Sequence, residues 1–558
     1  MKNQFHLVPL LFVAGAVSAQ VLPDAGALQQ QIDQARQSPL PPPKPQRLES
    51  PPPALERLAG PSVTVSAFRF EGNSVLGQAE LAAALQGYVQ RPLSFAELQA
   101  ATNAVGNAYR EAGAIARAYL PRQDIEAGVV TIAVIEARFG GVRIDGAGRI
   151  DAGQALRIVE RAQRPASLLG ADALDRAILL IDDLPGVGAI GNLSAGERDG
   201  ETTLVLRLTG EALLAGEASV DNSASRSTGA TRASASVSLN SPLRLGDQGV
   251  LNLQHTEGSD YLRAAWSAPV GAAGWRAGAN ASSLRYRLVA AEFAALHARG
   301  SADSVGIDAS YPLLRSRLAN LFLQISADSK RYDNQANGTV SSHYQLDSIS
   351  AALSANRFDE FAGGGANSGN LALVHGQVKL DGSPNQAADA ASTRSGGSFS
   401  KLRYGLSRQQ ALSADWSLAA SLAGQYASKN LDSSEKFYLG GLYGVRAYPA
   451  SEAGGSNGQL VNVELRARLP RGAALSSFYD WGHVTVNRHN DFAGAAQVNG
   501  YSLKGAGLAL AWSGPARVSL KAVWARRIGS HPSPNLNGSD QDGSLHKNRY
   551  WLQASVPF

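Results

Sequence analysis

The chain has 558 residues and a net charge of +5, a surplus too small for this length to indicate nucleic-acid binding. Charged residues make up 17% of the chain, against about 25% in an average soluble protein, and 58 glycines make it rich in turns. The absence of cysteine excludes disulfides, thiolate metal sites, iron–sulfur clusters and cysteine nucleophiles. With only nine scattered histidines, we expect no metal site and no cofactor.

The first residues are typical of an exported protein. Lys2 precedes an apolar stretch from Leu7 to Val17, and small residues up to Ala19 form a cleavage site, so residues 1–19 are a predicted signal peptide. A membrane-spanning helix needs about 20 apolar residues, and no segment of this chain reaches that length. Membrane insertion would therefore require a β-barrel, with a soluble periplasmic protein as the alternative.

Residues 20–61 contain a short helix followed by a spacer. Asp24 to Gln37 carries a narrow apolar stripe on a glutamine-rich helix, formed by Ala25, Leu28, Ile32 and Ala35. Residues 39–61 are rich in proline, which favours an extended, semi-rigid linker. A helix of this kind is either a frayed terminal segment or a docked plug, and the residues alone leave both open.

Two mixed modules follow, over residues 62–137 and 138–210. The first is predicted to hold a strand at Val63–Phe70, helices at Gln78–Gln86 and Phe95–Glu111, and strands at Ile115–Leu120 and Val129–Ile135. The second repeats this order with a strand at Val142–Ile144, helices at Ile150–Ala162 and Ala171–Leu184, and a strand at Thr202–Leu208. The edge strands of such small sheets can pair with an extended peptide, so we expect both modules to bind one.

Residues 211–558 show period-2 segments of about ten residues separated by turn residues, which is the pattern of transmembrane strands. In Leu460–Leu469, valine, leucine and alanine point one way while asparagine, glutamate and arginine point the other. A soluble sandwich gives the same alternation, but the chain also ends on an alternating aromatic strand whose last residue is Phe558. The length predicts about sixteen to eighteen strands, enough for an aqueous channel.

Three short motifs match functional patterns in letters only. Gly186–Gly191 resembles a dinucleotide fingerprint and Gly454–Gly458 an esterase elbow, but neither is predicted to open a helix. Asp540–Gly543 resembles part of a calcium loop without its glutamate, and we expect a solvated surface loop there.

Several segments resemble one family, the outer-membrane transporters of two-partner secretion (TpsB, the ShlB/FhaC/HecB type of haemolysin secretion/activation proteins). The resemblance covers nearly the whole mature chain. Ala118–Ile125 with Gly128–Ile132 resembles the closing hairpin of the first POTRA domain, and Asp183–Val187 resembles the end of the second helix of the second. Asp221-Asn222 with Ser227-Thr228-Gly229 is similar to the first barrel hairpin, and Trp551–Ser555 to the last strand. The resemblance implies an antiparallel transmembrane β-barrel of about sixteen strands, preceded by two α/β POTRA domains and an N-terminal plug helix.

Two motifs about thirty residues apart carry the resemblance furthest. Val445-Arg446-Ala447-Tyr448 resembles the tip of a long loop that folds back into the barrel, and Phe478-Tyr479-Asp480-Trp481-Gly482 resembles the inner-wall motif that receives it. An arginine in a confined lumen needs a carboxylate, which a guanidinium can engage with two hydrogen bonds, so we expect Arg446 to pair with Asp480. Because Ala447 stands where the family usually has glycine, the loop tip must adopt a conformation that alanine tolerates.

By this resemblance the protein exports one large, unfolded exoprotein of the adhesin or cytolysin class (TpsA-like). It would lie in the outer membrane of a Gram-negative bacterium, with its POTRA domains in the periplasm. Its other implied partners are the barrel assembly machinery and outer-membrane lipid, with no nucleic acid and no enzymatic activity. The alternatives are an insertase or assembly factor of the same superfamily, a translocation module for autotransporters, a diffusion porin, and a barrel-linked hydrolase.

Overall fold

The computed structural model describes residues 23–35, 62–198, 200–450, 452–535 and 537–558. The predicted signal peptide and proline-rich linker lie outside these residues, as do both ends of the segment predicted as a plug, 20–22 and 36–38. Within the described part of the chain, no helix is both long and apolar enough to cross a membrane.

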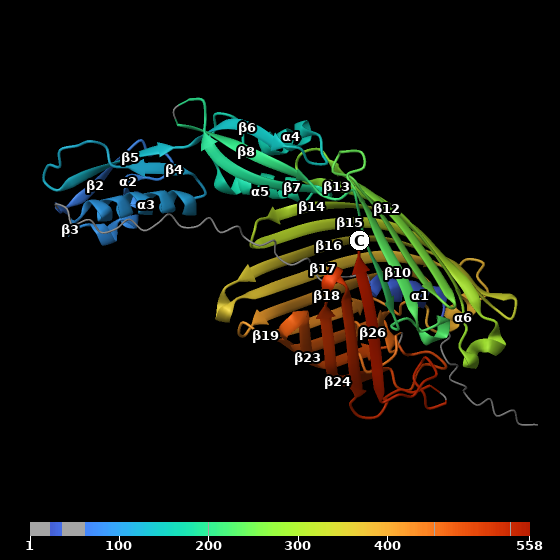
Figure 1. The fold of residues 1–558 in the computed structure, drawn as a ribbon. Helices are drawn as coiled ribbons and strands as arrows, with labels where there is room; N and C mark the ends of the chain where they lie inside the picture. The colour runs from blue at the N-terminus through green and yellow to red at the C-terminus, as the bar shows by residue number, and fades with distance from the viewer. Residues whose placement is uncertain (1–22, 36–61, 199, 451, 536) are drawn as a thin grey trace, which may run out of the picture.

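Sixteen antiparallel strands close into a barrel, which confirms the predicted fold class (Figure 1). The strands follow one another around the barrel in chain order, and the last pairs with the first. They are β9 (Leu214–Asp221), β10 (Arg232–Asn240), β11 (Gln248–Thr256), β12 (Ser259–Val270), β13 (Trp275–Arg287), β14 (Arg299–Arg315), β15 (Ala319–Ala336), β16 (Thr339–Asp359), β17 (Gly365–Lys379), β18 (Gly397–Ala411), β19 (Trp416–Ala427), β22 (Asn457–Arg468), β23 (Ala473–Thr485), β24 (Gly500–Ser513), β25 (Ser519–Arg527) and β26 (Asn548–Pro557).

The barrel forms because its strands alternate in polarity. On β26, Tyr550 and Leu552 are 64% and 59% exposed on the outer face, while Trp551 between them is 5% exposed and faces the lumen. On β22, Val463 is exposed outside while Asn462 reaches the lumen, where it donates to a carboxylate. An apolar outer wall around a polar interior suits a lipid-embedded barrel and excludes the sandwich alternative.

The first small domain has a three-stranded sheet of order β2-β5-β4 and two main helices. Its elements are β1 (Val63–Val65), β2 (Ala67–Glu71), α2 (Gln78–Ala84), β3 (Arg91–Leu93), α3 (Phe95–Glu111), β4 (Ala116–Tyr119) and β5 (Val129–Glu136). The single strand predicted over Val63–Phe70 is wrong. At Ser66 the backbone N–H donates to the Gly128 carbonyl, and the chain divides into β1, which pairs with β3, and β2, which pairs with β5.

The second small domain repeats this plan beside the barrel (Figure 1). Its sheet has the order β6-β8-β7, made of β6 (Arg138–Gly146), β7 (Val187–Ala195) and β8 (Glu201–Gly210), and it is covered by α4 (Ala152–Ala162) and α5 (Ala171–Asp182). Strand β7 was not among the elements predicted from the sequence. The glycine run Gly186–Gly191 lies in the turn after α5 and in β7, so it does not open a helix.

Ion pairs join the second small domain to the turn between β14 and β15. The Arg315 guanidinium donates to both carboxylate oxygens of Asp183, at 2.7 and 2.8 Å. Arg317 binds Asp175 on α5 at 2.9 Å, and Arg176 of α5 donates to the Pro312 carbonyl at 2.6 Å. These contacts fix the angle at which this domain meets the barrel end.

Replacing both Asp175 and Asp183 by asparagine is expected to loosen this junction, because it removes two arginine–carboxylate pairs worth about 1–2 kcal/mol together. The distance distribution between spin labels on α4 and on the turn after β14 should broaden. Asp145→Asn is the matched control, since Asp145 is exposed on β6 and its side chain forms no hydrogen bond or ion pair with any described residue. A distribution equally narrow in the double variant would contradict the assignment.

Candidate functional site: the lumenal loop

The segment between β19 and β22, residues 428–456, folds into the barrel and is called the lumenal loop below. It contains a 3-10 turn at Ser433–Glu435 and two short paired strands, β20 (Phe437–Tyr438) and β21 (Gly454–Gly455). The predicted tip residues Val445, Ala447 and Tyr448 are fully buried, and Arg446 is 6% exposed. The loop is thus a packed part of the barrel interior.

Arg446 and Asp480 lie in direct contact. Arg446 Nε donates to Asp480 Oδ2 at 3.0 Å and Nη2 donates to Oδ1 at 2.8 Å, while the Arg446 backbone N–H also donates to Oδ2 at 3.0 Å. Asp480 is completely buried on the inner face of β23. A fully desolvated carboxylate holding both the side chain and the backbone of one residue fixes the loop tip to the wall.

Further wall residues complete the seat of Arg446. Its Nη1 donates to Glu464 Oε2 at 2.9 Å, and its Cζ lies 3.4 Å from the centroid of the Phe478 ring. Asn462 donates to Asp480 at 2.8 Å, and Trp551 Nε1 donates to the Arg446 carbonyl at 2.8 Å. The alternation in β22 predicted that Asn462 and Glu464 face the water-filled interior, but neither their contacts with Asp480 and Arg446 nor that of Trp551 with Arg446 were predicted.

Two glycines on the wall allow the loop to approach. A Cβ atom at Gly482 would lie 2.7 Å from Leu439 of the loop, which explains why the wall motif needs glycine at this position. A Cβ atom at Gly505 of β24 would lie 2.7 Å from the Ala447 methyl group. Ala447 has no positive φ, so alanine is tolerated at the tip because the opposite strand supplies the space.

Phe558 lies elsewhere, at the seam where β26 meets β9. Its backbone N–H and C=O both pair with Gly216 at 2.9 Å, and its ring lies over that glycine. The register between β26 and β9, Gln553–Pro557 with Glu217–Asp221, is the shortest in the barrel. The Asn222 side chain extends it by bonding to Tyr550 and Leu552 of β26.

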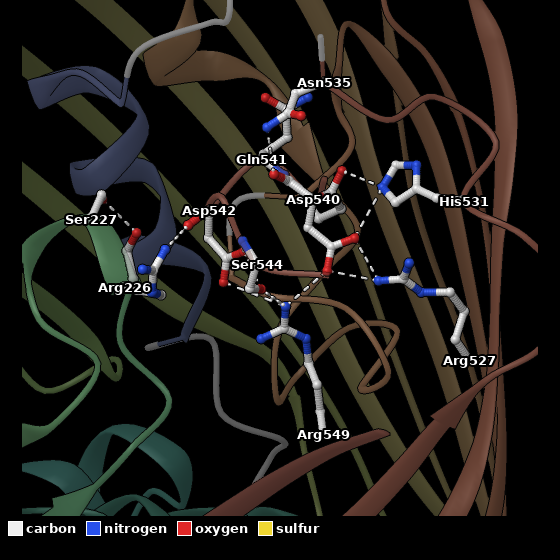
Figure 2. Close-up of polar contacts among 12 residues, drawn as sticks. Arg226, Ser227, Arg527, His531, Asn535, Asp540, Gln541, Asp542, Ser544 and Arg549 are labelled. Carbon is white, nitrogen blue, oxygen red and sulfur yellow. Dashed lines mark hydrogen bonds and ion pairs between the residues drawn. The ribbon is translucent and has the colours of Figure 1, made fainter. Parts of the chain in front are cut away.

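A second buried cluster contacts the lumenal loop at Glu452. Figure 2 shows its members around Asp540. His531 Nε2 lies 3.1 Å from Glu452 and 3.5 Å from Asp540, and the Gln541 backbone N–H donates to Glu452 at 2.8 Å. Asp540 is completely buried, so the prediction of a solvated loop at Asp540–Gly543 is wrong. Burial raises the pKa of Glu452, although the hydrogen bonds from His531 and Gln541 act in the opposite direction.

In this cluster, arginine side chains balance the charge of the buried carboxylates. Ligand atoms of Glu452, His531 and Asp540 lie within 4.8 Å of one another. However, Arg527 Nη2 donates to both oxygens of Asp540, at 2.5 and 2.7 Å, and Arg549 donates to one at 2.9 Å. Two guanidinium groups already balance the carboxylates, and a cation added there would be repelled.

The lumenal loop also holds the N-terminal helix α1 (Ala25–Ala35) inside the barrel, as Figure 1 shows. Ser433 donates to the Asp24 carboxylate at 2.8 Å, and Gln30 donates to the Lys436 carbonyl at 3.1 Å. On the wall side, the Ala25 N–H donates to Asn334 Oδ1 at 2.9 Å. The buried Leu28 packs with tyrosines and leucines of the inner wall, and Ile32 lies against the same cluster.

The helix and the loop leave part of the bore open. A cavity of about 360 Å³ remains between α1, the lumenal loop and the inner faces of β10 to β13, β18, β19 and β22. Its lining includes Leu28 and Ile32 of α1, Arg232 and Arg403 of the wall, and Tyr438 of the loop. Movement of α1 would therefore extend an existing space.

Comparison with known proteins identifies the family of this chain. A family model for the haemolysin secretion/activation protein ShlB/FhaC/HecB matches residues 200–509, and a model for the POTRA domain of ShlB type matches residues 63–137. The heme/hemopexin transporter protein HuxB of Haemophilus influenzae strain 86-028NP is 25% identical over 97% of this chain and 96% of its own length. The outer membrane transporter CdiB of Dickeya dadantii is 25% identical over 86% of this chain and 84% of its own length.

The fold is shared with solved structures. The structure of CdiB from Escherichia coli has a TM-score of 0.70 and 21% identity, and the match covers 97% of this chain and all of that one. BamA from Haemophilus ducreyi lacking POTRA domains 1–3 has a TM-score of 0.53 and 13% identity over 89% of this chain. The protein is a barrel of the Gram-negative outer membrane with its POTRA domains in the periplasm. The chain belongs to the haemolysin secretion/activation family of the ShlB/FhaC/HecB type, the outer-membrane transporters of two-partner secretion.

Proposed function

We propose that this protein exports a single TpsA-like exoprotein of the adhesin or cytolysin class, which enters unfolded from the periplasm. The observation that carries the proposal is a bore filled by two separate parts, a helix held by a few polar contacts and a loop pinned by Arg446 to the buried Asp480. The wall is continuous, so the cargo must pass where these parts now lie.

In this proposal each segment has one task. Residues 1–19 direct export and are removed, residues 20–38 act as the plug, and residues 39–61 tether it in the periplasm. Residues 62–137 and 138–210, POTRA 1 and POTRA 2, receive the cargo, and residues 211–558 conduct it. The barrel assembly machinery inserts the chain into outer-membrane lipid. No enzymatic step, cofactor, metal or nucleic acid takes part.

The cargo would bind first to a POTRA sheet by adding a strand at an edge. The edge strand β7 of POTRA 2 is the better candidate because its second half is exposed, with Leu193 45% accessible. In POTRA 1 the edge strand β2 is partly occupied, since the Gln78 side chain bonds to both the N–H and the C=O of Phe70. Folding of the cargo outside the cell would then drive export in one direction.

Removal of residues 62–210 is expected to abolish binding of the exoprotein's N-terminal region to the purified protein in detergent. The probe is the N-terminal region of a candidate TpsA-like exoprotein, and binding is measured by its retention on the immobilised transporter. Heat-modifiable migration in gels checks that the shortened barrel is still folded. Undiminished retention by the folded, shortened barrel would contradict cargo recognition by the POTRA domains.

An insertase for other barrel proteins is the second candidate, because the BamA fold is related. The two functions differ in what accumulates when the gene is deleted. Export of one partner predicts that a single exoprotein is trapped in the periplasm while the other outer-membrane proteins remain at normal levels. Loss of many outer-membrane proteins with no trapped exoprotein would instead support the insertase.

A further inference from the structure

We propose that the outer face of β13, β14 and β15 binds the phosphates of lipid A, the phosphorylated glycolipid of the outer leaflet. Four exposed arginines, Arg285, Arg287, Arg299 and Arg331, form this surface, which is called the arginine patch below. It lies outside the lumen and takes no part in the path proposed for the cargo.

Strand alternation places the patch on the lipid-facing side. Tyr286 and Tyr332, which neighbour patch residues in the chain, are buried in the lumen against the cluster that holds α1. Since successive side chains of a strand point to opposite faces, Arg285, Arg287 and Arg331 point outward. The outer face of β14 shows this directly, because Val305 and Ile307 are 60% and 64% exposed.

The patch also lies at the outer-leaflet end of the barrel. POTRA 2 binds Arg315 and Arg317, at the opposite end of β14 from Arg299. Along the outer face of β14 the order from the periplasmic side is Ile307, Val305, Asp303, Ser301 and Arg299. The arginines therefore stand just beyond the apolar band, at the level of the lipid headgroups.

Two arginines of the patch lie side by side, and their mutual repulsion is unfavourable unless an anion binds between them. Arg287 lies directly opposite Arg299 in the β13–β14 register, and like charges in directly opposed positions destabilise a sheet. The hydrogen bonds of these two residues go to neutral oxygens, from Arg287 to the Glu257 carbonyl at 3.1 Å and from Arg299 to Gln335 at 3.3 Å. None of the four arginines forms an ion pair with a carboxylate in the described part of the chain.

The acidic residues nearby do not neutralise the patch. Asp260 on β12 lies opposite Arg285 and is bound by His255, and Asp333 on β15 is bound by His343. Asp303 lies opposite Arg331 in the register without a salt bridge to it. Four arginines thus remain against three aspartates, two of which already have a histidine partner. Guanidinium groups bind phosphate through paired hydrogen bonds, and lipid A presents two phosphates directly above its acyl chains, so its headgroup meets the arginines while its chains meet Val305 and Ile307.

The test compares three forms of the full chain in detergent: the unaltered protein, Arg287→Gln/Arg299→Gln, and the control Arg471→Gln/Arg517→Gln. The control removes two exposed arginines from periplasmic turns, which face the other leaflet. Binding of bisphosphorylated lipid A and of enzymatically dephosphorylated lipid A is measured by thermal unfolding and by the amount of lipid retained. The Arg287→Gln/Arg299→Gln form should bind the phosphorylated lipid at least about tenfold more weakly, and the control should bind normally.

Equal binding of phosphorylated and dephosphorylated lipid A would overturn the proposal, as would normal binding by the Arg287→Gln/Arg299→Gln form. Loss of exoprotein binding with unchanged lipid binding would also overturn it and assign the patch to a polypeptide. If that variant does not fold, Arg285→Gln/Arg331→Gln replaces it, because those two side chains form no hydrogen bond with any described residue. The same tenfold loss is expected there.

Discussion

Arg446→Ala is expected to reduce export at least about tenfold while the barrel still assembles, and Asp480→Asn should do the same. Replacing Arg446 leaves the fully buried Asp480 without its guanidinium partner, and an uncompensated buried charge costs about 3–5 kcal/mol. A change of 1.4 kcal/mol already shifts an equilibrium about tenfold, so the loop tip would leave its seat. The strands pair through their own backbone hydrogen bonds, which neither change removes. Export is measured as exoprotein in the medium, and assembly by heat-modifiable migration.

Arg466→Gln is the matched control for these variants. Arg466 binds the same Glu464 carboxylate at 2.9 Å, but its side chain is 47% exposed and it touches neither Asp480 nor the loop tip in the described contacts. It should leave export nearly unchanged. Arg446→Lys is expected to behave like the alanine variant, because a single ammonium cannot reach Asp480 and Glu464 together as the guanidinium does. Unimpaired export by both Arg446→Ala and Asp480→Asn would contradict the proposed role of this contact.

Deletion of Asp24 to Gln37, which contains α1, is expected to raise single-channel conductance in planar bilayers several-fold. A helix with its side chains is about 10–12 Å across and occupies much of the bore of a barrel this size. Its removal would join the space it occupies to the 360 Å³ cavity beside it. Unchanged conductance would reject α1 as the plug.

A milder change tests the same point with the helix still present. Asn334→Ala with Ser433→Ala removes the acceptor for the Ala25 N–H and the donor to Asp24. We expect brief channel openings whose conductance equals that of the deletion variant. Ser326→Ala is the control, since Ser326 lies on the same strand as Asn334 but bonds to Ser350 and Asp328. It should show the closed behaviour of the unaltered protein.

The sequence predicted those elements whose start, end and exposed face depend only on neighbouring residues. The helix Phe95–Glu111 has its predicted bounds because Ser94 and Glu97 form a capping box and Gly113 follows its end, all within one short segment. The barrel was predictable because alternation and turn residues recur in every strand. The strand at Val63–Phe70 failed because its division at Ser66 depends on Gly128, far along the chain.

By itself the sequence determined the order of the parts, the strand faces and the two motifs that meet at Arg446 and Asp480. Only the tertiary structure decided that Glu464 and Trp551 complete that seat, and that Asp540 is buried between Arg527 and Arg549. The physical reason is that strand polarity is a property of neighbouring residues, whereas burial of a charge depends on which distant side chains the closed barrel brings to it. Closing the barrel places β26 beside β9 and under the lumenal loop, and no local pattern encodes that contact.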